Sequence, residues 1–330
     1  MNSNKESQPI PPPPGVIGAL KAGLDVISTH VSVILLPLTL DAFLWLGPRL
    51  SVKNIFTALY TDTISFYDAN GISVEELKQV EDVWMEFFQR FNLLGILRTF
   101  PVGISSLMQG RMPVASPLGA SEAIEVGSWL SFLGWLVLLT LLGWTFGAMY
   151  FQRVSRLVAR PESAFPSART IGQSLLFSVG FMLVALVLGV PVLIVLSLLN
   201  LFGPSVMQVG MFMMMLFASW VVVPLFFTPH GIFLRGDNAL RSVITSLRMS
   251  RFTLPSASLF VLALFIAAQG LNILWNVPTD DSWMLLVGIA GHAFVTTSLL
   301  AASFIYYRDI HAWMNLVAER LNTNAPPHTL

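Results

Sequence analysis

Cysteine is absent from this chain of 330 residues, and charged residues are scarce. The lack of cysteine excludes disulfide bonds, thiolate metal sites and cysteine nucleophiles. Charged residues make up 11% of the chain, whereas soluble globular proteins carry about 25%. Acidic and basic residues balance to a net charge of zero, so no basic excess points to a nucleic-acid partner.

The sequence motifs of common catalytic sites are also missing. The chain has no His-Glu-x-x-His, no Gly-x-Ser-x-Gly, no phosphate-binding loop and no dinucleotide fingerprint. Its histidines are scattered without the spacing of metal ligands, at His30, His230, His292, His311 and His328. We therefore expect a protein that is not an enzyme and that has no cofactor and no metal site.

Apolar residues make up 55% of the chain and gather in long runs. A membrane-spanning helix needs about 20 mostly apolar residues. Five runs reach that length, at 128–151, 174–199, 206–227, 256–277 and 284–306. A sixth run, 31–46, reaches it when Val26 and Ile27 extend it. The predicted fold class is an all-α integral membrane protein with six transmembrane helices.

The distribution of positive charge predicts the orientation of these helices. If the N-terminus is cytoplasmic, the inside segments are 1–26, 152–172, 230–254 and 307–330. They hold 12 of the 18 lysine and arginine residues, whereas the short outside loops 200–205 and 278–283 hold none. Cytoplasmic loops carry the excess of basic residues, so both termini are predicted to be cytoplasmic. An N-out chain or a re-entrant first segment is the alternative.

The segments outside the apolar runs divide the chain further. Residues 1–14 are polar and proline-rich and are expected to be disordered. Residues 15–30 show helical spacing of apolar residues and belong with the first span in a unit 15–46. This amphipathic helix either lies on the inner membrane surface or extends the first span. Residues 308–330 are expected to form a cytoplasmic tail.

Residues 47–127 are the one sizeable segment without a spanning run. The sequence Ser73-Val74-Glu75-Glu76 is a capping box that predicts a helix reaching about Phe91. A second helix is predicted over 52–67. Such a segment is too small for a large core of its own, so we expect a small helical extracytoplasmic insertion that packs on the outer membrane surface.

A basic amphipathic helix is predicted within 230–254. Leu240, Val243, Ile244 and Leu247 form its apolar stripe, and Arg241, Arg248 and Arg251 surround that stripe. This pattern suits a membrane surface with anionic lipid, although the arginines equally suit a role in topology alone. Similar lead-ins precede spans at 15–46, 165–199 and 237–273, which suggests three helical hairpins.

Polar residues inside the predicted spans are the candidates for a binding site, because such groups are unfavourable in hydrocarbon. Asp41, Gln269, Asn272 and His292 fall in one layer near the outer side, with Asp41 about 10 Å deep at 1.5 Å per residue. They either line a polar cavity, with Asp41 and His292 paired, or form polar contacts between helices. Gly143 and Gly147 fit a small-residue motif for helix packing.

The last third of the chain carries a further pattern. Its elements are Asn238-Ala239-Leu240-Arg241-Ser242, Ser246-Leu247, Ala293-Phe294-Val295 and Phe304-Ile305-Tyr306-Tyr307-Arg308-Asp309. Over about 215–315 it resembles the multi-pass membrane domain attached to some bacterial glycerophosphoryl diester phosphodiesterases and found in uncharacterised integral membrane proteins. The phosphodiesterase domain itself has no counterpart here, and Arg308 interrupts the final motif. The resemblance implies a bacterial cytoplasmic-membrane protein and carries over no catalytic residue.

Two functions are compatible with these patterns. The first is a non-enzymatic membrane protein that binds or organises lipid, a partner membrane protein or a second copy of itself. The second is a transporter or permease component that uses the polar layer around Asp41. An intramembrane enzyme acting on lipid is a third interpretation, for which only Asp41 and His292 offer an acid–base pair.

Overall fold

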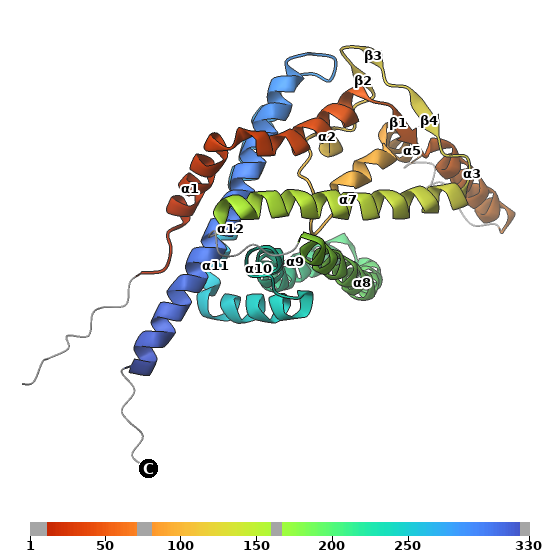
Figure 1. Ribbon diagram of the computed structural model, residues 1–330. Coiled ribbons are helices and arrows are strands. Elements are labelled where there is room, and N and C mark those ends of the chain that lie inside the picture. The colour runs from red at the N-terminus through yellow and green to blue at the C-terminus, as the bar shows by residue number, and fades with distance from the viewer. Residues whose placement is uncertain (1–11, 71–80, 160–166, 324–330) are drawn as a thin grey trace, which may run out of the picture.

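A computed structural model describes residues 12–70, 81–159 and 167–323 of the chain (Figure 1). Residues 1–11 of the proline-rich tail and the capping box at 73–76 lie outside these ranges. The described residues are mainly helical. The helices are α1 (Val16–Thr29), η1 (Val31–Ile34), α2 (Leu35–Leu46), α3 (Lys53–Ala69), α5 (Glu81–Arg90), η2 (Leu93–Arg98), α6 (Met108–Arg111), α7 (Trp129–Val158), α8 (Ser167–Asn200), α9 (Pro204–Phe226), α10 (Thr228–Arg235), α11 (Ala239–Trp275) and α12 (Leu285–Thr323).

Four helices in the described ranges, α7, α8, α11 and α12, are long and apolar enough to cross a membrane. Two bent pairs raise the number to as many as six if each pair is one span. One pair joins Val16–Thr29 to Val31–Leu46 at 93°, and the other joins Pro204–Leu216 to Val221–Arg235 at 43°. Length and composition are therefore compatible with a membrane protein.

The outer surfaces of α8 and α9 are strongly apolar. Leu183, Val187 and Leu193 on α8 are each more than half exposed, as are Val209 and Phe212 on α9. Contiguous apolar surface of this extent is rare on soluble monomers. In a bilayer the same side chains contact hydrocarbon and need no protein cover.

One helix, α11, contains both the basic amphipathic segment predicted within 230–254 and most of the predicted span 256–277. The helix is interrupted locally at Thr253, which has φ −122° and ψ 18° and lies two residues before Pro255. Proline removes a backbone donor and disturbs the preceding turn. The predicted helix within 230–254 is therefore the first part of a longer helix.

The first part of α11 turns its small polar face inward. Ser242, Ser246 and Ser250 are buried, whereas Leu240 is 72% exposed and Ile244 is 42% exposed. Serines four residues apart share one helix face. Small side chains allow neighbouring helices to approach closely, so the predicted apolar stripe faces mostly away from the bundle.

The N-terminal helix α1 packs along α12 (Figure 1). Ala19, Gly23 and Ile27 form its buried face. A Cβ atom on Gly23 would lie 2.5 Å from the carbonyl oxygen of Ser298 and 2.7 Å from the Cβ of Ala302. Only glycine permits this close approach between α1 and α12. Helix α1 is therefore held against the side of α12.

Two short parallel strands join the ends of the segment 47–127. β1 (Arg49–Ser51) pairs with β4 (Ala123–Glu125). A second, antiparallel pair joins β2 (Ala115–Ser116) and β3 (Gly119–Ala120). Helices α3 and α5 pack against each other, with the rings of Phe56 and Phe88 stacked at 4.1 Å between centroids.

Two of the three helical hairpins predicted from the sequence match the helix pairs that are in contact. α8 packs against α9, and α11 packs against α12. α2 instead packs mainly against α12, because the segment 93–111 lies against α7. The first and last parts of the chain therefore meet in the bundle.

Candidate functional site

The segment 93–111 runs back against the bundle instead of remaining beside α3 and α5. It consists of η2, an irregular stretch and α6. The side chain of Asn92 fixes its start, because its Oδ1 accepts hydrogen bonds from the backbone nitrogens of Leu50 at 3.0 Å and Leu94 at 3.1 Å. The hydroxyl of Thr99, a residue with φ 40°, donates to the carbonyl of Val102 at 2.9 Å. The peptide bond between Phe100 and Pro101 is cis.

This segment crosses α7 at its two glycines. A Cβ atom on Gly143 would lie 2.7 Å from the carbonyl oxygen of Leu97, and one on Gly147 would lie 2.6 Å from the Cα of Gly103. Between them, Trp144 Nε1 donates to the carbonyl of Phe100 at 3.1 Å. The two glycines therefore contact the end of η2 and the irregular stretch after it. Gly143 is at the midpoint of α7, so the segment reaches the middle of that helix.

Asp41 holds the end of the segment in place. Its carboxylate is fully buried and accepts hydrogen bonds from the Ser106 hydroxyl, from Leu107 N at 2.9 Å and from Met108 N at 3.3 Å. These two backbone groups precede or begin α6 and have no helical partner of their own. Hydrogen bonds to a carboxylate are stronger than those between neutral groups.

His292 reaches the same segment from α12. Its Nε2 lies 3.2 Å from the Ser105 hydroxyl, one residue before the serine that contacts Asp41. The predicted direct pairing of Asp41 with His292 is not seen. The consecutive residues Ser105 and Ser106 connect the two groups instead, since Ser105 contacts His292 and Ser106 contacts Asp41.

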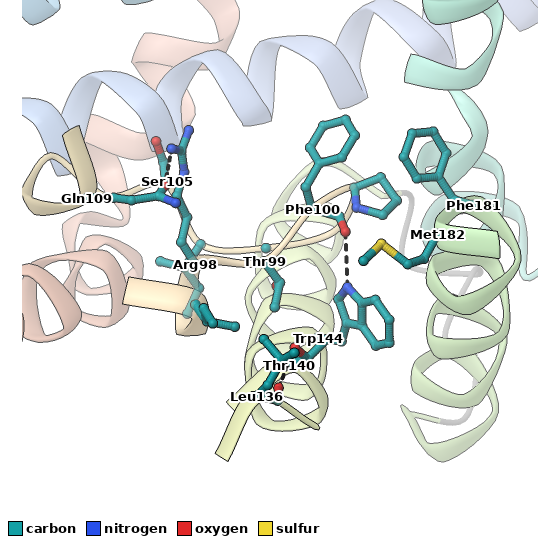
Figure 2. Close-up of a pocket in the computed structure, with 14 residues that line it drawn as sticks. Arg98, Thr99, Phe100, Ser105, Gln109, Leu136, Thr140, Trp144, Phe181 and Met182 are labelled. Carbon is teal, nitrogen blue, oxygen red and sulfur yellow. Dashed lines mark hydrogen bonds between the residues drawn. The ribbon is translucent and has the colours of Figure 1, made fainter. Parts of the chain in front are cut away.

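Arg98 provides the positive charge of this region. Its guanidinium donates to the side-chain oxygen of Gln109 and interacts electrostatically with Asp41 and with His292. Figure 2 shows Arg98 and Gln109 together at one side of a cavity. The cavity has a volume of about 630 Å³ and lies between the segment 93–111, α7 and α8.

The opposite wall of the cavity is apolar. Phe100, Trp144, Phe181 and Met182 line it, and the rings of Phe100 and Phe181 are 5.2 Å apart between centroids (Figure 2). The cavity thus has a cationic, hydrogen-bonding end and an aromatic end. A ligand with an anionic group and an apolar part matches both.

The other two residues of the predicted polar layer lie elsewhere. Gln269 is exposed on α11, and Asn272 is half-buried on the same helix. Neither lines the cavity beside Arg98. The structure therefore brings Asp41 and His292 to one segment and leaves Gln269 and Asn272 outside it.

The three arginines that were predicted to face lipid have different surroundings. Arg241 forms an ion pair with Asp237, between Nε and Oδ1 at 3.4 Å. Arg248 lines a second cavity together with Arg241, whereas Arg251 is exposed outside it. Within the described ranges, neither Arg248 nor Arg251 forms an ion pair.

Sequence reasoning missed Arg98, Ser105, Ser106 and Gln109. The stretch 93–108 contains one charged residue among otherwise apolar or small side chains. Pro101 and Gly103 interrupt it, and it is too short to span a bilayer as a helix. The sequence feature that could have indicated this segment is an apolar run with an arginine, a proline and a glycine near its centre.

The cavity offers no set of metal ligands. No group of three or more histidine, aspartate or glutamate residues in the described part of the chain is arranged to hold a metal ion. The chemistry available is hydrogen bonding and charge attraction toward an anion.

Comparison with known proteins identifies no relative. No protein-family model, no curated protein and no solved structure matches the chain.

Proposed function

We propose that this chain is a multi-pass membrane protein, not an enzyme, that binds a lipid or another amphipathic anion in the cavity beside Arg98. The cavity carries the proposal, because a guanidinium at one end and aromatic side chains at the other match an anionic headgroup and an acyl chain. An arginine in this position is favourable only when an anion or polar groups balance it.

The proposal includes a six-span topology in which α1 to α2 and α9 to α10 are broken spans. Irregular backbone at membrane depth is tolerated where protein buries it or where it lines a cavity. The segment 93–111 meets this condition, since α7, Asp41 and His292 surround it. In this topology 93–111 is a re-entrant segment entering from the extracytoplasmic side, and both termini are cytoplasmic.

We further place the protein in the bacterial cytoplasmic membrane. The distribution of arginine and lysine supports the orientation, and the resemblance of 215–315 to a bacterial membrane domain supports the location. Membrane lipids are its proposed partners, together with a second membrane protein or another copy of the chain.

Lipid retention after purification tests the function. The protein is reconstituted in nanodiscs of phosphatidylcholine with phosphatidylglycerol, released into mild detergent, and analysed by native mass spectrometry. Arg98→Gln removes the charge, and we expect at least a tenfold loss of bound phosphatidylglycerol, since a hydrogen bond to a charged group contributes about 1.5–3 kcal/mol. Arg90→Gln is the matched control, because Arg90 lies on the exposed face of α5 in an ion pair with Glu86.

A second pair of variants fills the cavity without changing its charge. Met182 lines the cavity, whereas its neighbour Leu183 is 57% exposed and does not. Met182→Trp is expected to reduce retention and Leu183→Trp is not. Equal retention in Arg98→Gln, Met182→Trp and their controls would contradict the proposal.

A transporter or permease component is the second candidate. The 93° bend between α1 and Val31–Leu46 supports it, because broken helices are typical of transporters. Proteoliposomes with a fluorescent anionic lipid in one leaflet distinguish the two candidates. Redistribution between leaflets that Arg98→Gln abolishes indicates transport, and binding without redistribution indicates the first function.

A further inference from the structure

A second cavity lies at the opposite end of the bundle, where α10, α11 and α12 meet. Its volume is about 580 Å³, and Arg235, Arg241, Arg248 and His311 contribute its charged and titratable lining. His311 follows His292 by nineteen residues on α12, or about 28 Å at 1.5 Å per residue. This distance is close to the thickness of a bilayer's hydrocarbon core, about 30 Å.

One buried carboxylate orients two of the arginines. Asp237 contacts Arg235 Nε at 3.3 Å and Arg241 Nε at 3.4 Å, and its own side chain is 6% exposed. Arg241 makes its ion pair through Nε, and its side chain is 69% exposed. Arg248 adds a third charge without any carboxylate partner in that part of the chain, so positive charge exceeds negative charge at the cavity.

His311 contacts one of these arginines. Its Nδ1 lies 3.3 Å from Arg235 Nη1. A guanidinium only donates, so Nδ1 accepts and the ring proton of the neutral imidazole is on Nε2. That Nε2 is buried and has no hydrogen-bond partner in the described structure. The contribution of His311 to the cavity is therefore its Nδ1, which accepts from Arg235 and holds that guanidinium in place.

The polar lining is therefore composed mainly of donors. We propose that this cavity binds a phosphate group, with Arg241 and Arg248 contacting its oxygens and His311 Nδ1 holding Arg235 beside them. Arginine forms bidentate hydrogen bonds with phosphate. The site is separate from the cavity beside Arg98 and does not depend on the function proposed for it.

The rim of the cavity favours a phosphate carried by a lipid. Leu240 and Ile244 line it and are exposed on the outward face of α11, and Met249 and Met314 complete the apolar part. A phospholipid would place its phosphate among the arginines and its chains along this face. A soluble phosphate ester would use the arginines alone.

Arg248 and Arg251 provide a matched pair of test positions. Both are exposed arginines on α11, three residues apart, without an ion pair in the described structure, and only Arg248 lines the cavity. Neither contacts Asp237, so Arg248→Gln and Arg251→Gln are both expected to fold with unchanged melting temperatures.

Binding is measured with the full-length protein in mild detergent by native mass spectrometry. One set of samples is titrated with dioleoyl phosphatidic acid and another with glycerol 3-phosphate. We expect Arg248→Gln to raise the Kd at least tenfold, whereas Arg251→Gln and Arg98→Gln leave this Kd unchanged. Tight binding of phosphatidic acid alone identifies a lipid site, and similar binding of glycerol 3-phosphate identifies a site for a soluble phosphate ester. Equal affinities of Arg248→Gln and Arg251→Gln for both probes, or no binding by the wild type, would overturn the proposal.

Discussion

His292 and His311 lie on the same helix, but their surroundings differ. Beside His292, the chain supplies partners for its own polar groups: Ser105 contacts the imidazole, and three donors satisfy Asp41. Beside His311, the arginines and the imidazole present donors that find few acceptors. The first arrangement fixes a piece of backbone in place, whereas the second is complete only when an anion is present.

Because Asp41 fixes the segment 93–111, removing its carboxylate is expected to reduce the stability of the protein most. Asp41→Ala leaves one hydroxyl and two backbone donors buried without an acceptor, at about 1–3 kcal/mol for each group. We expect the free energy of unfolding in an SDS titration to fall by about 3 kcal/mol or more. Asp25→Ala, on the exposed side of α1, is expected to change it by less than about 0.5 kcal/mol. Similar values for the two variants would show that the cluster does not hold 93–111.

Gly147→Ala is expected to have the next largest effect. The added Cβ would lie within 2.8 Å of backbone atoms of Val102 and Gly103, so the segment must move. Overpacking of this kind costs about 1–3 kcal/mol. Gly134→Ala on the same helix meets no atom within 4 Å and is expected to be neutral or slightly stabilising. Thermal unfolding in detergent measures both, and equal melting temperatures would place 93–111 away from α7.

A pair of serine variants gives the smallest effect and the sharpest contrast. Ser106→Ala removes a donor to Asp41 and is expected to destabilise the protein by about 1–2 kcal/mol. Ser246 is fully buried, and its hydroxyl has no hydrogen-bond partner among the residues that the structure describes, so Ser246→Ala is expected to change stability by less than about 0.5 kcal/mol. SDS titration of both variants makes the comparison. A larger loss for Ser246→Ala would mean that the hydroxyl has a bound partner.

The sequence predicted the long helices because hydropathy is a local property. α7, α8, α9, α11 and α12 all overlap the predicted runs. It did not predict which face of α11 is buried, since in a bilayer an apolar stripe can face lipid while serines face protein. Leu240 and Ser246 show this reversal directly.

The candidate site was predicted only in part, because its residues come from distant parts of the sequence. Asp41 and His292 were identified because an ionisable residue inside an apolar run is conspicuous. Arg98 was assigned to the outer segment, since its place beside Asp41 depends on contacts between residues far apart in the sequence. Asp41 and Ser106 are 65 positions apart, and no local pattern records such a pair.

The contact between Gly23 and α12 also has a consequence for synthesis. Gly23 contacts Ser298 and Ala302, so about 275 residues are translated between the first and second halves of this interface. At roughly 5–20 residues per second, the interval is about 14–55 seconds. During that time the face of α1 formed by Ala19, Gly23 and Ile27 has no final partner. Helix α1 is therefore made well before its partner α12, and a chain that stops short of α12 leaves that face open.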